Sequence, residues 1–195
     1  EVLVGLPCGV QLVPGASGLS RMARLSEFEQ ARLTEELTAL EADNDFIVVD
    51  CAAGIGPETI RFAAAADNAI VVTTPEPTAI TDAYAVIKLV ARQAGDEGLS
   101  LLTNMAADRH EARATHERIS SVARQFLSAR VLDAGYVLRD PKVGEAVRRR
   151  EPVVLAYPRT AATRCLAALA NKRGRGGPLV KEDMGFFRRL ASWFA

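Results

Sequence analysis

The hydrophobic positions of this chain fall into short runs that alternate with longer segments of helical period. Runs rich in Val and Ile have the length of strands at residues 10–13, 46–50, 69–73, 99–103 and 130–137. Between them, apolar residues recur at three- and four-residue spacing, as on one face of a helix. This alternation is typical of a parallel sheet covered by helices on both faces. The pattern therefore predicts an α/β fold.

Capping residues and helix breakers set the limits of the predicted helices. Ser26 and Glu29 have the spacing of a capping box, ahead of an apolar stripe that ends near Leu40. Gly95 stands where it would close a helix over 81–94. Further helices are predicted over 57–65, over 111–128, from 140 to 149 and over 160–172.

Composition and charge narrow the class of protein. With 195 residues, 49% of them hydrophobic and 25% charged, the chain suits one globular domain, alone or with a tail. Its 24 basic and 24 acidic residues balance, so no overall charge favours a nucleic-acid-coating protein. The widely spaced Cys8, Cys51 and Cys165 argue against a disulfide framework or a zinc site. No apolar run reaches the roughly 18 to 20 residues of a membrane span, and a cytoplasmic location fits best.

Candidate chemistry begins with residues 46–56, FIVVDCAAGIG, an apolar run that ends in Asp50 and enters a glycine-containing turn. A carboxylate at the carboxyl end of a buried parallel strand lies where α/β sheets bind ligands, and it can hold Mg²⁺ through water. Gly54 lets a backbone N–H approach a phosphate oxygen. The alternative is that Asp50 only caps the next helix.

Three other segments carry a resemblance to a known family. Residues 71–88 (VVTTPEPTAITDAYAVIK), 12–18 (LVPGASG) and 140–154 (DPKVGEAVRRREPVV) resemble the MinD/ParA class of P-loop ATPases. Within that class they are similar to the FlhG branch, also called FleN or YlxH, which controls flagellar number and placement. The resemblance runs across residues 5–170 and implies a P-loop NTPase fold, a homodimer, and the cofactors ATP and Mg.

The resemblance also implies roles for single residues. Asp50 matches the switch II aspartate that organises the water shell of Mg, and Gly54 matches the glycine whose N–H senses the γ-phosphate. Asn104 matches the asparagine that reads the adenine ring, and Asp140 lies in the loop that closes over the base. Cys51 stands where the family usually has a small hydroxyl residue, and we interpret it as a buried small side chain.

One part of the family pattern is absent from the sequence. No GxxxxGK[ST] or KGGxGK[ST] loop occurs, and neither does the switch I aspartate. In the family both precede the LVPGASG strand, so about 60 or more residues are expected to be missing. We therefore expect this chain, a fragment holding the C-terminal two thirds of the ATPase domain, not to hydrolyse ATP unaided. Unpaired strand edges should make it unstable or aggregation-prone, and a sharp cooperative melt of soluble monomer would contradict this.

The C-terminal region is predicted to be a linker over 172–178, after a domain over 1–171, and an amphipathic helix over 179–195. KRGRGGP has no apolar residue, and its alternative interpretation is a small RNA-binding segment. The helix would place apolar residues on one face and basic residues on the other, as in helices that lie on anionic membranes. Its alternative is docking on its own domain. The predicted membrane-contacting residues are Phe186, Phe187, Arg188, Arg189, Leu190, Trp193 and Phe194.

Together these features predict a cytoplasmic, reversibly membrane-associated ATPase whose partners are a second copy, the inner face of the membrane and flagellar assembly proteins, with no direct nucleic acid. A non-catalytic module that keeps only the binding surfaces is a rival. A ParA-type partitioning ATPase is another, although the neutral charge and the terminal helix disfavour it. His110 and His116 are interpreted as exposed, and 148–150 (RRR) as charges at a helix C-terminus rather than as a nucleic-acid contact.

Overall fold

The structure is a computed structural model that describes residues 3–6, 9–13, 32, 35, 38–175 and 185–192. By internal contacts the chain divides into two compact units: unit 1 is 1–49 with 184–195, and unit 2 is 50–183. The predicted end of the linker at 178 and start of the terminal helix at 179 stay predictions, because 176–184 lies outside the described residues.

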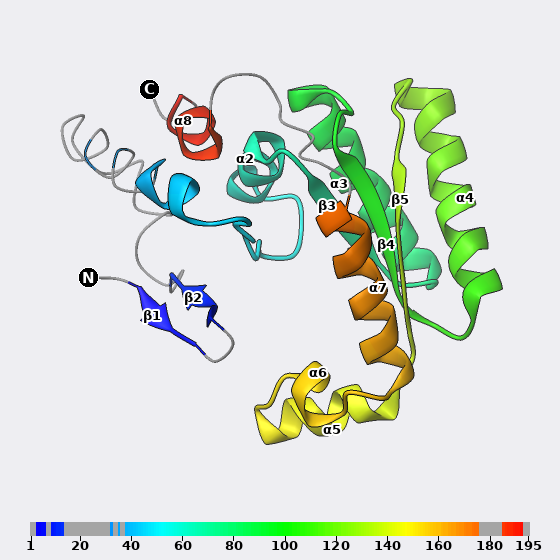
Figure 1. The fold of residues 1–195 in the computed structure, drawn as a ribbon. Helices are drawn as coiled ribbons and strands as arrows, with labels where there is room; N and C mark the ends of the chain where they lie inside the picture. Colours follow the sequence, from blue (N-terminus) through cyan, green and yellow to red (C-terminus); the bar gives the residue numbers. More distant parts are fainter. Residues whose placement is uncertain are drawn as a thin grey trace. The chain divides into compact units, whose positions relative to one another are not determined.

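Unit 2 is built on a three-stranded parallel sheet in the order β3-β4-β5 (Figure 1). Its strands are β3 (Ala69–Thr73), β4 (Leu99–Ala106) and β5 (Leu132–Leu138). Helices α3 (Pro77–Ala94) and α4 (Arg109–Leu127) connect them, because parallel neighbours need a crossover connection. The predicted α/β class and its parallel sheet are confirmed.

Both faces of the sheet carry core side chains because residues alternate along each strand. On one face, Leu99 and Leu101 of β4 pack with side chains of α3, α4 and α2 (Pro57–Ala65). On the other face, Leu102 packs with β5 and with α7 (Ala161–Arg175). Strand β3 is an edge strand of this sheet as described. Its Ile70 and Val72 remain 40% and 57% exposed, so its second face is covered less than its first.

The helix ends follow the capping residues. The backbone N–H of Gly95, at φ +77°, donates to Ala91 O and ends α3 as predicted. Asp108 caps α4 by accepting from the N–H of Glu111 at 2.8 Å. After β5 come α5 (Pro141–Arg149), α6 (Val153–Ala156) and α7. Helix α7 continues into the first residues of the predicted linker.

Unit 1 contains a short antiparallel pair, β1 (Val4–Gly5) and β2 (Gln11–Leu12), and the helix α8 (Phe186–Ala191). Residues 32, 35 and 38–43 are helical, whereas Ser26 and Glu29 of the predicted capping box lie outside the described residues. The strand predicted over 10–13 corresponds to β2, which has only two residues and pairs with an antiparallel neighbour.

The prediction of a strand over 46–50 is wrong. These residues are in no strand, and Phe46 and Val48 are 68% and 90% exposed. No described strand pairs with 46–50, and an apolar run becomes a strand only when a neighbour pairs with its backbone.

Candidate functional site

Asp50 lies at the start of a loop that leads into α2, and its side chain is exposed. It does not cap that helix, because the residue at the N-cap is Gly56 and no side chain bonds there. The loop is held by Thr59, whose hydroxyl donates to Ala52 O at 3.2 Å. The alternative reading of Asp50 as a helix cap is therefore wrong, and its carboxylate makes no hydrogen bond with the described residues.

The residue after Asp50 reports the local environment. Burial raises the pKa of the Cys51 thiol above its ordinary value, and the Asp50 carboxylate raises it further. Cys51 is half-buried and in no disulfide, in agreement with its interpretation as a small buried side chain. A raised pKa keeps the thiol protonated and unreactive near neutral pH.

Gly54 has a backbone that only glycine adopts easily. Its φ is +102°, while a Cβ built at this position would meet nothing within 4 Å. The requirement for glycine therefore comes from backbone conformation, not from crowding. The predicted phosphate contact of the Gly54 N–H stays a prediction.

Asn104 lies near the carboxyl end of β4 and is half-buried. Its Oδ1 accepts from the N–H of Met105 at 2.9 Å, and its amide nitrogen has no partner among the described residues. Met105 has a positive φ of 57°, which is strained for a residue with a side chain. The asparagine is thus held by its neighbour while its amide donors stay available.

Asp140 holds two helices together. Its Oδ1 accepts from the N–H of Lys142 at 3.0 Å, at the start of α5, and its Oδ2 accepts from the N–H of Ala162 at 3.2 Å, at the start of α7. These bonds, the one from Lys142 first, keep the pKa of the carboxyl below its ordinary value. Both oxygens are thus occupied by backbone donors, and this geometry makes Asp140 a positioning residue. Its predicted contact with a cofactor stays a prediction.

The loops after β3, β4 and β5 meet at one edge of the sheet, because the carboxyl ends of parallel strands lie together. The N–H of Arg139, just after β5, donates to Ala106 O at the end of β4 at 2.8 Å. Thr74 follows β3, and its buried hydroxyl has no hydrogen-bond partner within the described part of the chain. Sequence reasoning singled out neither Thr74 nor Met105; the TTPEPT string contained the first, and no local pattern indicated the second.

The described residues hold no group of three or more His, Cys, Asp or Glu side chains that could bind a metal ion. The predicted site residues supply two carboxylates, of which Asp140 already accepts backbone bonds with both oxygens, and one glycine turn. The sequence has no phosphate-binding loop with its lysine. The residues present therefore do not fit a complete Mg–nucleotide site by themselves.

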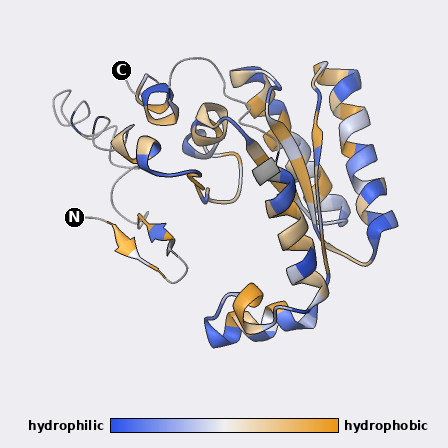
Figure 2. Cartoon of the chain, viewed as in Figure 1, coloured by the Kyte–Doolittle hydropathy of each residue, from blue (hydrophilic) through white to orange (hydrophobic). Residues whose placement is uncertain are grey.

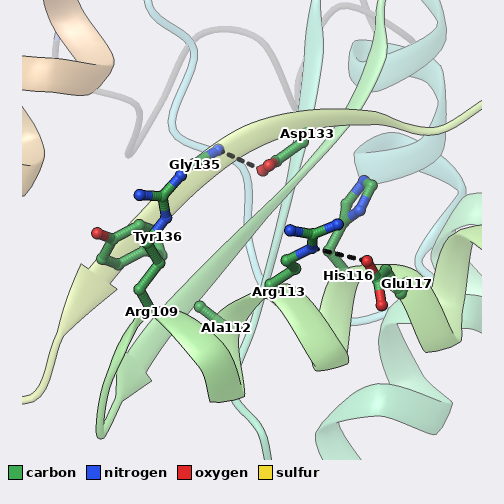
Figure 3. A pocket seen from close by; sticks show the side chains of 8 residues that line it. All are labelled: Arg109, Ala112, Arg113, His116, Glu117, Asp133, Gly135 and Tyr136. Atoms are coloured by element: carbon green, nitrogen blue, oxygen red, sulfur yellow. Dashed lines mark hydrogen bonds and ion pairs between the residues drawn. The ribbon is translucent and has the colours of Figure 1, made fainter.

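A cavity of about 320 Å³ lies between α4 and β5, and none of the predicted site residues lines it (Figure 3). Arg113 pairs with Glu117 at 2.8 Å, and the Asp133 carboxylate accepts from the N–H of Gly135 at 2.8 Å. The Nε2 atom of His116 lies 3.3 Å from Val131 O. The side chain is half-buried, so the prediction that His116 is exposed is wrong. Basic and acidic side chains both line the cavity. Its lining residues are Arg109, Ala112, Arg113, His116, Glu117, Asp133, Gly135 and Tyr136.

The terminal helix α8 is docked. Phe186, Phe187 and Leu190 are 8%, 7% and 0% exposed, whereas Arg188 faces solvent. The N–H of Phe187 donates to a carboxylate oxygen of Glu41 at 2.8 Å. The apolar face is therefore covered by the chain itself, as in the docking alternative. Trp193 and Phe194 lie outside the described residues, and among the residues described no helix has the length and apolarity needed to cross a bilayer.

Comparison with known proteins found no matching family model but found curated relatives. The chain is 37% identical to the antiactivator FleN of Pseudomonas aeruginosa over 172 residues, 88% of this chain and 61% of FleN. It is 38% identical to the flagellum site-determining protein YlxH of Helicobacter pylori over 129 residues, 66% of this chain and 43% of YlxH. It thus spans less than two thirds of the length of either protein.

A solved structure supports the fold. The septum site-determining protein MinD of Pyrococcus horikoshii, complexed with Mg-ADP, superposes with a TM-score of 0.66. The match covers 93% of this chain and 71% of that protein at 21% sequence identity. At that identity the likeness concerns the fold.

Proposed function

Because this chain belongs to the MinD/ParA family of ATPases, together with FleN and YlxH, we propose that the intact protein is an ATPase that controls flagellar number or placement. The observation that carries the proposal is the identity of 37% with an antiactivator and 38% with a flagellum site-determining protein. The fold alone supports many functions, so the sequence relationship decides between them.

In the proposed site, ATP and Mg bind at the edge formed by the loops after the strands. Asp50 would hold a water ligand of Mg, the N–H of Gly54 would contact the γ-phosphate, and the free amide of Asn104 would read adenine. Asp140 would position α5 and α7 below the base. The phosphate-binding loop is not in this sequence, so hydrolysis requires residues that this chain does not supply.

Nucleotide binding would drive homodimerisation, and the dimer would attach to the inner face of the cytoplasmic membrane through α8. One short amphipathic helix binds a membrane weakly, and two copies in a dimer raise the overall affinity steeply. The buried Phe186, Phe187 and Leu190 imply that α8 must leave its docked position first. The protein would thus cycle between a cytoplasmic and a peripheral membrane state, with flagellar assembly proteins as its partners and no direct nucleic acid.

The first test is to read the coding DNA directly upstream of the Glu1 codon in frame. A glycine-rich loop with its lysine would support the ATPase. We then expect Asp50→Ala to lower ATP hydrolysis of the intact protein about a hundredfold or more, and Asp82→Ala, an exposed aspartate on α3, to leave it unchanged. Flagella counted on cells carrying Asp50→Ala should change in number or position; unchanged counts would contradict the proposed role.

The membrane part has its own test. Removing 179–195 should abolish sedimentation of the intact protein with anionic vesicles, and Arg188→Glu, at an exposed position of α8, should weaken it without disturbing the buried rings. Unchanged sedimentation of both variants would refute a membrane role of α8.

A second candidate is a non-catalytic module that keeps the partner and membrane surfaces. A start codon directly before Glu1 with no phosphate-binding loop would establish this candidate and remove the ATPase.

A further inference from the structure

Helices α5 and α6 form a basic corner at residues 141–160, which we call the α5–α6 corner (Figure 1). It carries five basic and two acidic side chains, whereas the whole chain has 24 of each. The corner therefore concentrates positive charge in a molecule that is neutral overall, which marks it as a surface for an anionic partner.

Internal ion pairs neutralise part of this charge. Lys142 Nζ lies 2.7 Å from a carboxylate oxygen of Glu145. A guanidinium nitrogen of Arg149 lies 3.2 Å from a carboxylate oxygen of Glu151. Both acidic side chains of the corner are used in these pairs. The unbalanced arginines are Arg148, Arg150 and Arg159, which are exposed and form no ion pair with the described residues.

A helix dipole does not account for all three arginines. Arg148 lies in the last turn of α5 and Arg150 follows that helix as its C-cap, where a cation is favourable. Arg159 stands just before α7, at the positive end of that helix, where the dipole repels a cation. The dipole of α7 therefore does not account for Arg159.

Exposed aliphatic side chains occur among the arginines. Val147 on α5 is 69% exposed, and Val154 and Leu155 on α6 are 40% and 52% exposed. Figure 2 shows the hydrophobic colour of α6 beside the hydrophilic α5. Positive charge combined with exposed aliphatic groups matches the interface of an anionic bilayer, where arginines meet headgroups and aliphatic side chains enter the acyl boundary.

The corner lacks what a nucleic-acid surface needs. Its one aromatic ring, Tyr157, has the Lys142 ammonium 5.1 Å and the Arg149 guanidinium 5.9 Å from its centroid. The Tyr157 hydroxyl donates to Glu145 at 2.9 Å. A base that stacked on the ring face occupied by these cations would have to displace them. The bonds around Tyr157 also link α5 to the segment that follows α6.

We propose that the α5–α6 corner is a second membrane-contacting surface, which binds anionic phospholipid through Arg148, Arg150 and Arg159 and inserts Val147 and Leu155. The proposal extends the membrane association proposed above, but it lies wholly in unit 2 and does not depend on α8. Two weak contacts per copy would give the stable yet reversible attachment that one short helix cannot provide.

The test is sedimentation of the full chain with phosphatidylglycerol-containing vesicles and with pure phosphatidylcholine vesicles. Arg148→Gln/Arg150→Gln/Arg159→Gln should lose about fivefold in affinity for each arginine removed and should flatten the salt dependence. Val147→Ser/Leu155→Ser should weaken binding while keeping the salt dependence. Circular dichroism checks that both variants stay folded.

The matched control removes the same charge elsewhere. Arg92, Arg118 and Arg124 are exposed on α3 and α4, and replacing all three with Gln should leave vesicle binding within twofold of the parent. An equal loss in this control, or no loss in the corner variant, would overturn the proposal. So would a corner variant that binds vesicles normally but no longer binds duplex DNA in fluorescence anisotropy, because the surface would then recognise nucleic acid.

The outcomes also separate this inference from the role proposed for α8. Loss of binding on removal of 179–195, with no effect of the corner substitutions, refutes the corner and keeps α8. Loss through the corner alone refutes α8 and keeps the corner. Additive losses support both surfaces.

Discussion

Two segments of nearly the same composition have opposite structures in this protein. Residues 46–50 read FIVVD and residues 69–73 read AIVVT. The second segment is strand β3, whereas the first is in no strand. At the centre of each, Val71 is 8% exposed and Val48 is 90% exposed.

Pairing explains the difference. Each residue of β3 lies opposite a residue of β4, from Ala69 opposite Leu99 to Thr73 opposite Thr103, so its backbone groups on that side are satisfied. No described strand pairs with 46–50. Strand propensity describes fitness for a pleated surface, and a neighbouring strand decides whether that surface exists.

The largest effect should come from placing a charge in each segment. Val71→Asp buries an unpaired carboxylate and should lower the free energy of unfolding by at least about 3 kcal/mol. Val48→Asp should change it by no more than about 0.5 kcal/mol, since an exposed side chain stays in water. Urea titration of dilute soluble protein, followed by circular dichroism, measures both. Equal losses would show that 46–50 is part of a packed strand in solution.

A second pair of substitutions tests the start of the β3–β4 pairing. Ala69 N–H donates to Gly98 O at 3.1 Å, and a Cβ on Gly98 would overlap the Asp67 carbonyl oxygen. Gly98 also has φ +73°, so we expect Gly98→Ala to cost about 3 kcal/mol or more. Gly95 has φ +77° with nothing within 4 Å of its Cβ position.

Gly95→Ala is thus the control for backbone strain alone and should cost about 1 kcal/mol. The same urea titration compares the two variants. If both variants lose the same free energy of unfolding, the overlap with Asp67 adds nothing to the cost of Gly98→Ala, and the positive φ accounts for all of it.

Most of the local structure in unit 2 could be predicted from the sequence, because local signals and tertiary packing agree there. The capping position of Gly95 and the apolar run 69–73 gave one helix end and one strand as they are found. The 46–50 strand could not be predicted reliably, because its formation depends on a partner strand and not on its own residues.

The candidate site was predictable only in part. Asn104 was located by resemblance, and the structure places it near the carboxyl end of β4. The positive φ of Met105 has no sequence signal, since that conformation comes from the tertiary fold. The engagement of Asp140 with α7 joins residues 22 positions apart, a contact that no local pattern contains.

A smaller effect on stability should distinguish the carboxylates of Asp140 and Asp50. Asp140 follows strand β5 and accepts backbone hydrogen bonds with both oxygens. Asp50 is the last residue of 46–50, which forms no strand. Asp140 has a lowered pKa in the folded state, so the folded protein binds fewer protons there than the unfolded chain. Its contribution is present above the ordinary carboxyl pKa and disappears as the pH falls through the lower folded value.

Asp140→Asn should therefore destabilise the protein at neutral pH and weaken its acid sensitivity below about pH 4, because the new amide nitrogen cannot accept from Ala162. Asp50→Asn should leave stability unchanged at each pH. Thermal melts from pH 3 to 7 measure both. An acid profile of Asp140→Asn that matches the parent would show that this carboxylate does not link α5 to α7 in solution.

The smallest effect concerns the Cys51 thiol beside Asp50, in the loop that leads into α2. Burial is the larger cause of the raised Cys51 pKa and the Asp50 charge the smaller. In a Cys8→Ser/Cys165→Ser background, Asp50→Asn should therefore speed alkylation of Cys51 at pH 8 only two- to threefold, roughly, by raising its thiolate fraction. Asp45→Asn, which removes an exposed charge in the same segment, should leave the rate unchanged. A rate that rises far more in Asp50→Asn would mean that the loop opens and exposes the thiol, and that Asp50 shapes this segment even without a strand.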